Sequence, residues 1–395
     1  MKKLLINQEK IADKEAFLKV CPFGALELVN GEVIVNAGCR MCGLCVKKSS
    51  NGEIEYIETE KYVDKSLWRG ICVYSDCDEG EIHPVTYELI GKAKELAKKV
   101  NFKVYCLFIG SAEKAKELLY YGVDEVFVYN NPSLKNFRIE PYTAVFENFI
   151  NTVKPSVILV GATPVGRQLA PRVAARFETG LTADCTVLDI EDNTDLVQIR
   201  PAFGGNIMAQ IATPAHRPQM ATVRYKVMNT PERSDELSGR IVICDIDEAL
   251  LQSGIEVLNV EKKEKAKTIE SAEIIVAVGR GVKTSEDLSL VQRLADLLGA
   301  ELACTRPLAE NGWVESRRQI GLSGRTVRPK LIIACGVSGS VQFTAGMNRS
   351  ERILAINKDQ NAPIFKTAHY GVVGDIYDIV PRLITMLEGR KENEL

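Results

Sequence analysis

The sequence has few histidines, no long apolar segment and no block of like charge. Its 395 residues include three histidines, His83, His216 and His369, so neither a histidine-based triad nor a His-rich zinc site is expected. The formal net charge is −2 without a basic stripe, which argues against nucleic acid or an anionic membrane as partner. No apolar run is long enough to cross a bilayer, and the start, MKKLLINQEKIADKEAF, turns charged before a signal-peptide core could form. We therefore expect a cytoplasmic protein.

A disulfide framework is also not expected, because a reducing cytoplasm keeps thiols free, and a tight group of cysteines there indicates metal binding. Three of the 11 cysteines follow one another at two-residue gaps in NAGCRMCGLCVKKSS: Cys39, Cys42 and Cys45. A cubane iron–sulfur cluster needs four thiolates, and a bacterial ferredoxin run would supply the fourth near Ser49. The motif alone is therefore one ligand short.

A hairpin upstream supplies the missing thiolate. Asn30-Gly31 lies between alternating apolar residues, which is a strong signal for a two-residue turn. Such a hairpin brings Cys21, which precedes a proline, back beside Cys39. The arrangement resembles a two-cluster bacterial ferredoxin from which one cluster has been deleted. It predicts one [4Fe-4S] cluster, with a structural zinc site or a metal-free ferredoxin fold as alternatives. The predicted ligands are Cys21, Cys39, Cys42 and Cys45.

The length of the chain favours two or three domains. From about residue 67, short runs rich in Val, Ile and Phe alternate with segments of helical period, which predicts a parallel sheet covered by helices. Four strand-like runs between residues 181 and 225 have no helices between them, and predict antiparallel strands. After a joint rich in Lys and Glu, NVEKKEKAKTIESA, a second alternation of strands and helices begins.

The expected fold class is α/β: a small ferredoxin-like α+β domain followed by two Rossmann-like domains with parallel sheets. The predicted boundaries are 1–66, 67–262 and 263–395.

Three loops of the last domain contain the glycine and hydroxyl residues typical of anion binding. In VAVGRGVKT the backbone can approach an anionic group beside Arg280, but Thr284 replaces the third glycine of a dinucleotide fingerprint. The run IACGVSGSVQF places glycines and serines before a helix. It is not a nucleophile elbow, because Ser340 replaces the last glycine and no histidine is placed to activate Ser338. The third loop is QIGLSGRT.

Taken together, these loops resemble a known family. The stretch from CTRPLAENGWVESRRQIGLSGRT through KLIIACGVSGSVQFTAGMNRSERILAIN to YGVVGDIYDIVPRL is similar to the FAD-binding domain of the α subunit of electron-transferring flavoproteins. The segments GATPVGRQLAPRVAARFETGLTADCT and RPAFGGNIMAQIATPAHRPQMATVR resemble the preceding domain of the same family. The resemblance extends from about residue 67 to the C-terminus and implies FAD as a cofactor.

The resemblance also implies roles for individual residues. Arg280 is expected at the FAD pyrophosphate, Arg306 near the flavin ring as a positive charge, and Ser323 with its hydroxyl near N5 of the flavin. Many family members have a histidine where this chain has Phe343, which cannot hydrogen-bond the flavin. No catalytic residue is assigned. The residues expected to bind the cofactor are Arg280, Thr305, Arg306, Ile320, Gly321, Leu322, Ser323, Ser338, Gly339, Ser340, Val341, Gln342, Phe343, Asn357, Asp375 and Ile376.

The family resemblance implies an electron carrier that pairs with a β subunit and a flavin dehydrogenase. An added ferredoxin-like domain resembles the α subunits of electron-bifurcating complexes, in which NADH reduces a β-subunit flavin and electrons pass to ferredoxin and to the dehydrogenase. We expect an acyl-CoA-dehydrogenase-like partner, as in an enoyl-CoA or caffeyl-CoA reductase, acting on CH-CH donors. The alternatives are a lactate dehydrogenase complex, a self-contained NAD(P)-dependent oxidoreductase, and a scaffold without redox function.

Overall fold

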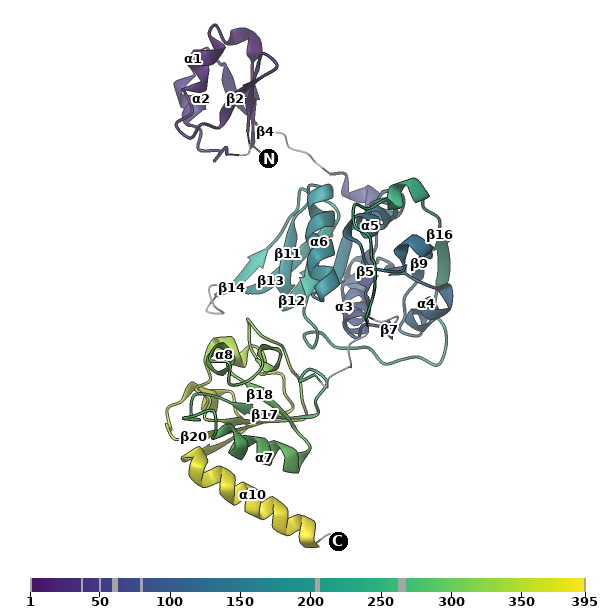
Figure 1. Cartoon of the computed structure of the whole chain (residues 1–395). Coiled ribbons are helices and arrows are strands. Elements are labelled where there is room, and N and C mark those ends of the chain that lie inside the picture. The colour runs from purple at the N-terminus through teal and green to yellow at the C-terminus, as the bar shows by residue number, and fades with distance from the viewer. Residues whose placement is uncertain are drawn as a thin grey trace. The chain divides into compact units, whose positions relative to one another are not determined.

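The computed structural model describes residues 2–36, 38–49, 51–58, 63–78, 81–202, 207–261 and 268–393. The chain divides into two compact units, Met1–Val63 and Asp64–Leu395 (Figure 1). The second unit contains two parallel sheets, one of seven strands and one of five. The α/β fold class predicted from the sequence is confirmed. The predicted boundary between residues 262 and 263 lies outside the described residues.

The N-terminal unit is a small α+β structure. Its strands form two antiparallel pairs, β1 (Lys2–Ile6) with β4 (Ile54–Glu58) and β2 (Leu26–Val29) with β3 (Glu32–Val35). Two short helices accompany them, α1 (Lys14–Leu18) and α2 (Leu44–Lys48). A small apolar core holds the unit together, and Val33 and Ile54 are each 1% exposed within it.

The predicted hairpin at Asn30-Gly31 is present. Val29 pairs with Glu32, so the turn contains two residues, and Asn30 (φ 52°) and Gly31 (φ 78°) both have positive φ. Two positive φ angles are typical of a type I′ turn, whose twist matches the twist of the flanking strands. The turn therefore returns the chain from β2 to β3 as the sequence indicated.

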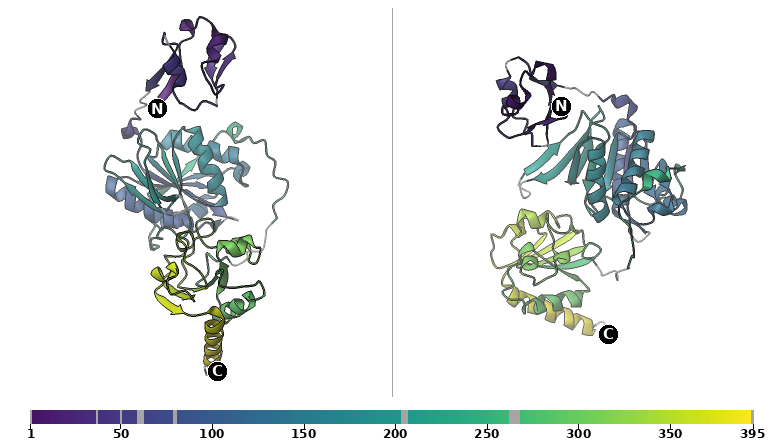
Figure 2. Two further views of the ribbon diagram at one scale, coloured as in Figure 1. Left: turned by 90° about the vertical axis from the view of Figure 1, so that its left-hand side faces the viewer. Right: turned by 45° about the horizontal axis from the view of Figure 1, so that its top comes forward.

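The seven-stranded sheet is parallel throughout, in the order β11-β15-β10-β5-β8-β9-β16. Its strands are β5 (Ile71–Ser75), β8 (Val104–Ile109), β9 (Glu125–Tyr129), β10 (Val157–Gly161), β11 (Leu181–Cys185), β15 (Gln219–Val223) and β16 (Arg240–Cys244). Helices cover both faces (Figure 2). One face packs against α3 (Val85–Val100) and α4 (Ala112–Leu119), and the other against α5 (Ile139–Val153) and α6 (Pro164–Arg176).

The prediction of antiparallel strands after residue 181 is correct for part of the segment only. Strands β12 (Val187–Ile190), β13 (Leu196–Ala202) and β14 (Ile207–Ile211) form a three-stranded antiparallel sheet. Strands β11 and β15 instead pair in parallel within the seven-stranded sheet. A strand-like sequence does not reveal its partner, because pairing between distant segments is decided by tertiary packing.

The five-stranded sheet is also parallel, in the order β18-β17-β19-β20-β21. Its strands are β17 (Ile274–Val278), β18 (Glu301–Cys304), β19 (Leu331–Cys335), β20 (Arg352–Asn357) and β21 (Tyr370–Val373). Helices α7 (Leu288–Leu298) and α10 (Ile376–Asn393) pack on one face. The other face is covered by residues of the connecting segments and their short helices, including Ile320, Phe343 and Ile364.

Glu88 of α3 is a buried carboxylate that binds the segment after β15. It is 4% exposed, and its oxygens accept hydrogen bonds from the backbone N–H groups of Lys226 (3.0 Å) and Met228 (3.2 Å). Burial raises the pKa of Glu88 to about 7, because desolvation of the charged form outweighs these two hydrogen bonds. Glu88 thus joins a helix of the seven-stranded sheet to a chain segment more than 130 residues away.

We expect Glu88 to make the stability of the protein depend on pH. The folded protein binds this proton more tightly than the unfolded chain, whose carboxyl has a pKa of 4.5, so the free energy of unfolding falls as pH rises from about 4.5 to about 7 and then levels off. The fall should be about 3 kcal/mol at most. Denaturant unfolding between pH 5 and 8 should show that Glu88→Gln lacks this component, whereas Glu95→Gln, at an exposed position of the same helix, keeps it. Equal pH slopes in the wild type and Glu88→Gln would contradict this expectation.

Candidate functional site

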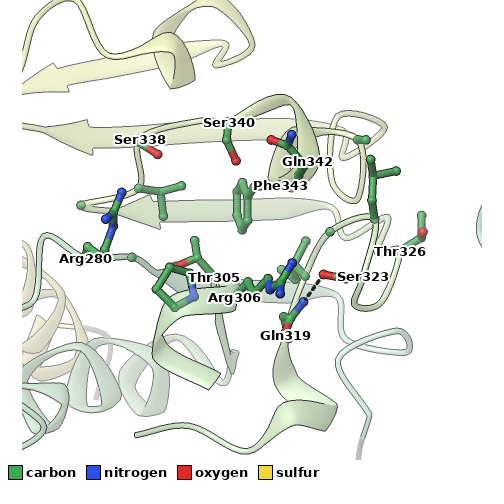
Figure 3. Close-up of a pocket in the computed structure, with 18 of the residues that line it drawn as sticks. Arg280, Thr305, Arg306, Gln319, Ser323, Thr326, Ser338, Ser340, Gln342 and Phe343 are labelled. Carbon is green, nitrogen blue, oxygen red and sulfur yellow. Dashed lines mark hydrogen bonds between the residues drawn. The ribbon is translucent and has the colours of Figure 1, made fainter. Parts of the chain in front are cut away.

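A cavity lies at the carboxyl ends of the five-stranded sheet. It has a volume of about 930 Å³ and is lined by residues of the loops that follow its strands (Figure 3). Numbered in chain order, the strands lie in the order 2-1-3-4-5, so the direction of winding reverses between β17 and β19. Open parallel sheets bind ligands at such a switch point, because the loops on its two sides diverge.

The loops after β17 and β19 are held together by backbone contacts. The N–H of Gly279 donates to the carbonyl oxygen of Cys335 and the N–H of Gly281 to that of Gly336, each at 3.0 Å. A Cβ atom on Gly281 would lie 2.5 Å from the Cα of Gly336, so the approach requires glycine. Arg280 lies between the two glycines and lines the cavity with an exposed side chain (Figure 3).

The loop after β19 is fixed by residues of the next strand and turn. Asn357, at the end of β20, donates its amide to the carbonyl oxygen of Val337 (2.8 Å), and the N–H of Ile364 donates to that of Ser338 (3.1 Å). Gly339 has φ 80°, and a Cβ there would collide with the backbone of Ile364. The predicted helix after this loop, α9 (Val341–Thr344), has only four residues.

Two predicted residues have partners within the protein that were not considered from the sequence. Arg306, at the start of α8 (Arg306–Glu310), forms an ion pair with Glu310 at 2.7 Å, and both side chains are more than half exposed. The charge that Arg306 offers to the cavity is therefore partly compensated and screened by water. Asp375 precedes α10 and accepts a hydrogen bond from the N–H of Tyr377 (3.0 Å), which leaves its second oxygen for other contacts.

The loop from Gln319 to Thr326 brings a hydroxyl to the cavity. The side-chain amide of Gln319 donates to the hydroxyl oxygen of Ser323 (2.8 Å; Figure 3), and the N–H of Leu322 donates to the carbonyl oxygen of Gln342 (2.8 Å). Beside it, Ile320 and Phe343 are 2% and 4% exposed and belong to the core on this face of the sheet. Phe343 therefore forms an apolar wall of the cavity.

The structure brings 14 of the 16 residues predicted to bind the cofactor to this one cavity. Gly339, in the loop after β19, and Val341, the first residue of α9, are not among the residues that line the cavity. The residues that line the cavity are Arg280, Thr305, Arg306, Ile320, Gly321, Leu322, Ser323, Ser338, Ser340, Gln342, Phe343, Asn357, Asp375 and Ile376. Their individual contacts with a cofactor remain predictions.

A second group of lining residues, which precede the five-stranded sheet in the chain, was not predicted from the sequence. They are Asp184, Thr186, Arg200, Pro201, Ala202, Arg224 and Val227. All of them except Val227 lie in the two segments that supported the family resemblance to the preceding domain, but no role was assigned to them. Arg224 donates to the carboxylate of Asp184 (2.7 Å) and to the carbonyl oxygen of Leu322 (2.6 Å).

The four cysteines predicted to bind a cluster all lie in the N-terminal unit. Cys45 is buried, Cys21 and Cys39 are half-buried, and Cys42 is exposed. Burial raises the pKa of Cys45, and the neighbouring thiols of Cys21 and Cys39 raise it further. Within the described ranges, however, no three His, Cys, Asp or Glu side chains are grouped as metal ligands. The structure gives the [4Fe-4S] site no support, and that site stays a prediction.

Among the helices of the described part of the chain, none is long and apolar enough to span a membrane.

Comparisons with known proteins agree with this architecture. Residues 71–249 match the electron transfer flavoprotein domain, and residues 268–348 match the electron transfer flavoprotein FAD-binding domain. The chain is 59% identical over 383 residues to the lactate dehydrogenase (NAD(+),ferredoxin) subunit LctC of Acetobacterium woodii. The aligned region covers 96% of this chain and 92% of that protein.

Two further relatives are electron transfer flavoprotein α subunits. The protein of Clostridium acetobutylicum is 42% identical over 337 residues, covering 82% of this chain and 99% of its own length. The protein of Megasphaera elsdenii is 39% identical over 339 residues, covering 83% of this chain and 99% of its own length. The identity to these proteins extends over most of the chain, and the matched FAD-binding domain contains most of the cavity's loops. The chain belongs to the α-subunit family of electron transfer flavoproteins, and its cofactor is FAD.

Proposed function

We propose that this chain is the α subunit of an electron-bifurcating complex in which a β subunit and a lactate dehydrogenase exchange electrons with NAD and ferredoxin. The observation that supports this most is the 59% identity to the lactate dehydrogenase subunit LctC over 96% of the chain. This similarity favours the lactate dehydrogenase alternative over the enoyl-CoA or caffeyl-CoA reductase that we expected first. An acyl-CoA-dehydrogenase-like partner and a CH-CH donor are accordingly not part of the proposal.

The chemistry of the cavity fits FAD. Cations lie beside the glycine loops, where Arg280 and Lys283 can meet a diphosphate. At the other part of the cavity, the apolar side chains of Ile320 and Phe343 adjoin the hydroxyl of Ser323, a combination suited to a ring with a polar edge. We assign the diphosphate to Arg280 and the flavin ring to the loop that contains Ser323.

When bound, FAD supplies the one- and two-electron chemistry of the chain. The residues of the chain bind it, orient it and set the charge around it. Arg306 places a positive charge near the ring, moderated by its ion pair with Glu310. Phe343 excludes water but donates no hydrogen bond to the flavin. Both features affect the stability of negative charge on the ring and hence its reduction potential.

We retain the [4Fe-4S] cluster in the N-terminal unit as part of the proposal. Its support is the sequence: Cys39, Cys42 and Cys45 follow one another at two-residue gaps, and Cys21 precedes the Asn30-Gly31 turn. The cluster would relay electrons between the flavins and external ferredoxin. The assignment of residues 1–66 as a ferredoxin-like domain belongs to the same proposal.

The proposed function is tested by co-purifying the chain anaerobically with its β subunit and dehydrogenase. We expect the complex to couple NADH oxidation to ferredoxin reduction when pyruvate is the second electron acceptor, and to show no coupling with an enoyl-CoA. Coupling with the enoyl-CoA alone would overturn the lactate assignment. Turnover of NADH by the isolated chain would overturn the role of electron-carrying subunit.

The loop after β19 provides a prediction about FAD affinity. Gly339→Ala should raise the dissociation constant for FAD at least about tenfold, because a methyl group there displaces the backbone of Ile364 and with it the loop. Gly312→Ala is the matched control, since Gly312 has a similar φ of 72° but open space around its Cβ position. Fluorescence titration of the FAD-free proteins measures both. Equal affinities for the two variants would show that the contact with Ile364 is not important.

The cluster gives a prediction about iron content. Anaerobically purified wild type should contain about four irons and four sulfides per chain, and Cys42→Ala should lose most of both. Cys42 is exposed, so its replacement removes a ligand without disturbing a core. Cys77→Ala, outside the proposed ligand set, should keep the wild-type iron content. Iron well below four in the wild type, or unchanged iron in Cys42→Ala, would refute the cluster.

A further inference from the structure

Arg224 occupies a position that the family resemblance did not explain. It follows β15 at the carboxyl end of the seven-stranded sheet, and its side chain lines the cavity. Its guanidinium donates through Nη2 to the carbonyl oxygen of Leu322 at 2.6 Å, and Nη1 lies 3.4 Å from the carbonyl oxygen of Gly321. Both carbonyl groups belong to the loop that presents Ser323. A residue of one sheet therefore holds a loop of the other.

A β-bulge fixes the partner that orients Arg224. The register between β11 and β15 shifts between Thr182 and Cys185, and Asp184 within this shift has φ 57°. Its N–H donates to the hydroxyl of Thr222 at 3.0 Å. Bulges redirect the side chain of the extra residue. Here the carboxylate of Asp184 accepts two hydrogen bonds from Arg224, from Nε at 3.0 Å and Nη2 at 2.7 Å.

The guanidinium is suited to this double task by its shape. Its planar fork directs donors to the Asp184 carboxylate and to the loop carbonyls at the same time, which a lysine ammonium cannot do with the same geometry. The Arg224 side chain is 21% exposed and that of Asp184 is 19% exposed, so the contacts are only partly screened by water. Hydrogen bonds to charged groups of this kind are about twice as strong as neutral ones.

The contact with Leu322 determines the direction of a donor. The carbonyl of Leu322 and the N–H of Ser323 belong to one planar peptide and point in opposite directions. Fixing the carbonyl toward Arg224 thus directs the N–H away from Arg224. Within the ranges that the structure describes, the Ser323 N–H has no hydrogen-bond partner in the protein, whereas the N–H of Leu322 donates to Gln342. The Ser323 N–H is therefore free to bind a ligand.

We propose that Arg224 is a positioning residue for the flavin: held by Asp184, it orients the Leu322–Ser323 peptide so that the Ser323 N–H and hydroxyl face the bound ring. This rests on the proposed contact of the Ser323 loop with FAD. Arg224 itself need not touch the ring. Its loss should loosen the loop before FAD binds and weaken FAD binding as a consequence.

The test uses Arg224→Met, with Arg167→Met as the matched control. Arg167 forms an ion pair with the same carboxylate, Asp184, at 3.0 Å, but the structure records no hydrogen bond from it to the described residues of the loop. Hydrogen–deuterium exchange of the FAD-free proteins should be at least about fivefold faster in peptides covering residues 319–326 of Arg224→Met, and unchanged in Arg167→Met. The dissociation constant for FAD should rise at least about tenfold in Arg224→Met only.

Three results would overturn the proposal: unchanged exchange of residues 319–326 in Arg224→Met, equal acceleration in both variants, or unchanged FAD affinity despite faster exchange. If Arg224→Met does not fold, Arg224→Lys replaces it. Residues 319–326 of Arg224→Lys should then exchange faster than in the wild type but more slowly than a freely exchanging loop. Exchange at the wild-type rate would overturn the proposal. Adding FAD to the wild type tests the underlying assignment separately. Failure of FAD to protect residues 319–326 would contradict the flavin contact while leaving the action of Arg224 on the loop intact.

Discussion

The close approach of two glycine backbones, Gly281 and Gly336, is the constraint on which the functional site depends. Their hydrogen bond joins the loops after β17 and β19 where the winding of the five-stranded sheet reverses, and neither position accommodates a Cβ without a collision. The two joined loops contain Arg280 and Ser338, both of which line the cavity. The rest of the site is arranged around this fixed junction, including the bracing of the second loop by Asn357.

The seven-stranded sheet contains a second reversal of winding, between β5 and β10, but its loops are used differently. There the hydroxyl of Thr163 donates to the buried carboxylate of Asp76, and the same oxygen accepts a hydrogen bond from the N–H of Gly166 at the start of α6. Side chains of the protein thus join the two loops across the switch point. Both sheets reverse their winding at such a point, but the residues after the strands differ: side chains join the loops of the seven-stranded sheet, whereas glycine backbones join those of the five-stranded sheet beside the cavity.

Local signals predicted much of the fold. The Asn30-Gly31 turn, the alternating strands and helices, and the glycine loops of the last sheet are all properties of short segments, and the structure contains them. The assignment of β11 and β15 to the parallel sheet could not be predicted in the same way, because it depends on pairing between distant strands. For the same reason the sequence missed Arg224, whose partner Leu322 is 98 residues away. The partner of Arg306, in contrast, lies four residues away and helical spacing could have indicated it.

The central claim is that FAD binds at the carboxyl ends of the five-stranded sheet and not at the corresponding point of the seven-stranded one. The most direct measurement is hydrogen–deuterium exchange of the FAD-free wild-type chain with and without added FAD. The account predicts protection of residues 279–284, 319–326 and 336–343 and no change at residues 75–78 and 161–166. Protection at the latter segments, or no protection of the former at saturating FAD, would contradict it.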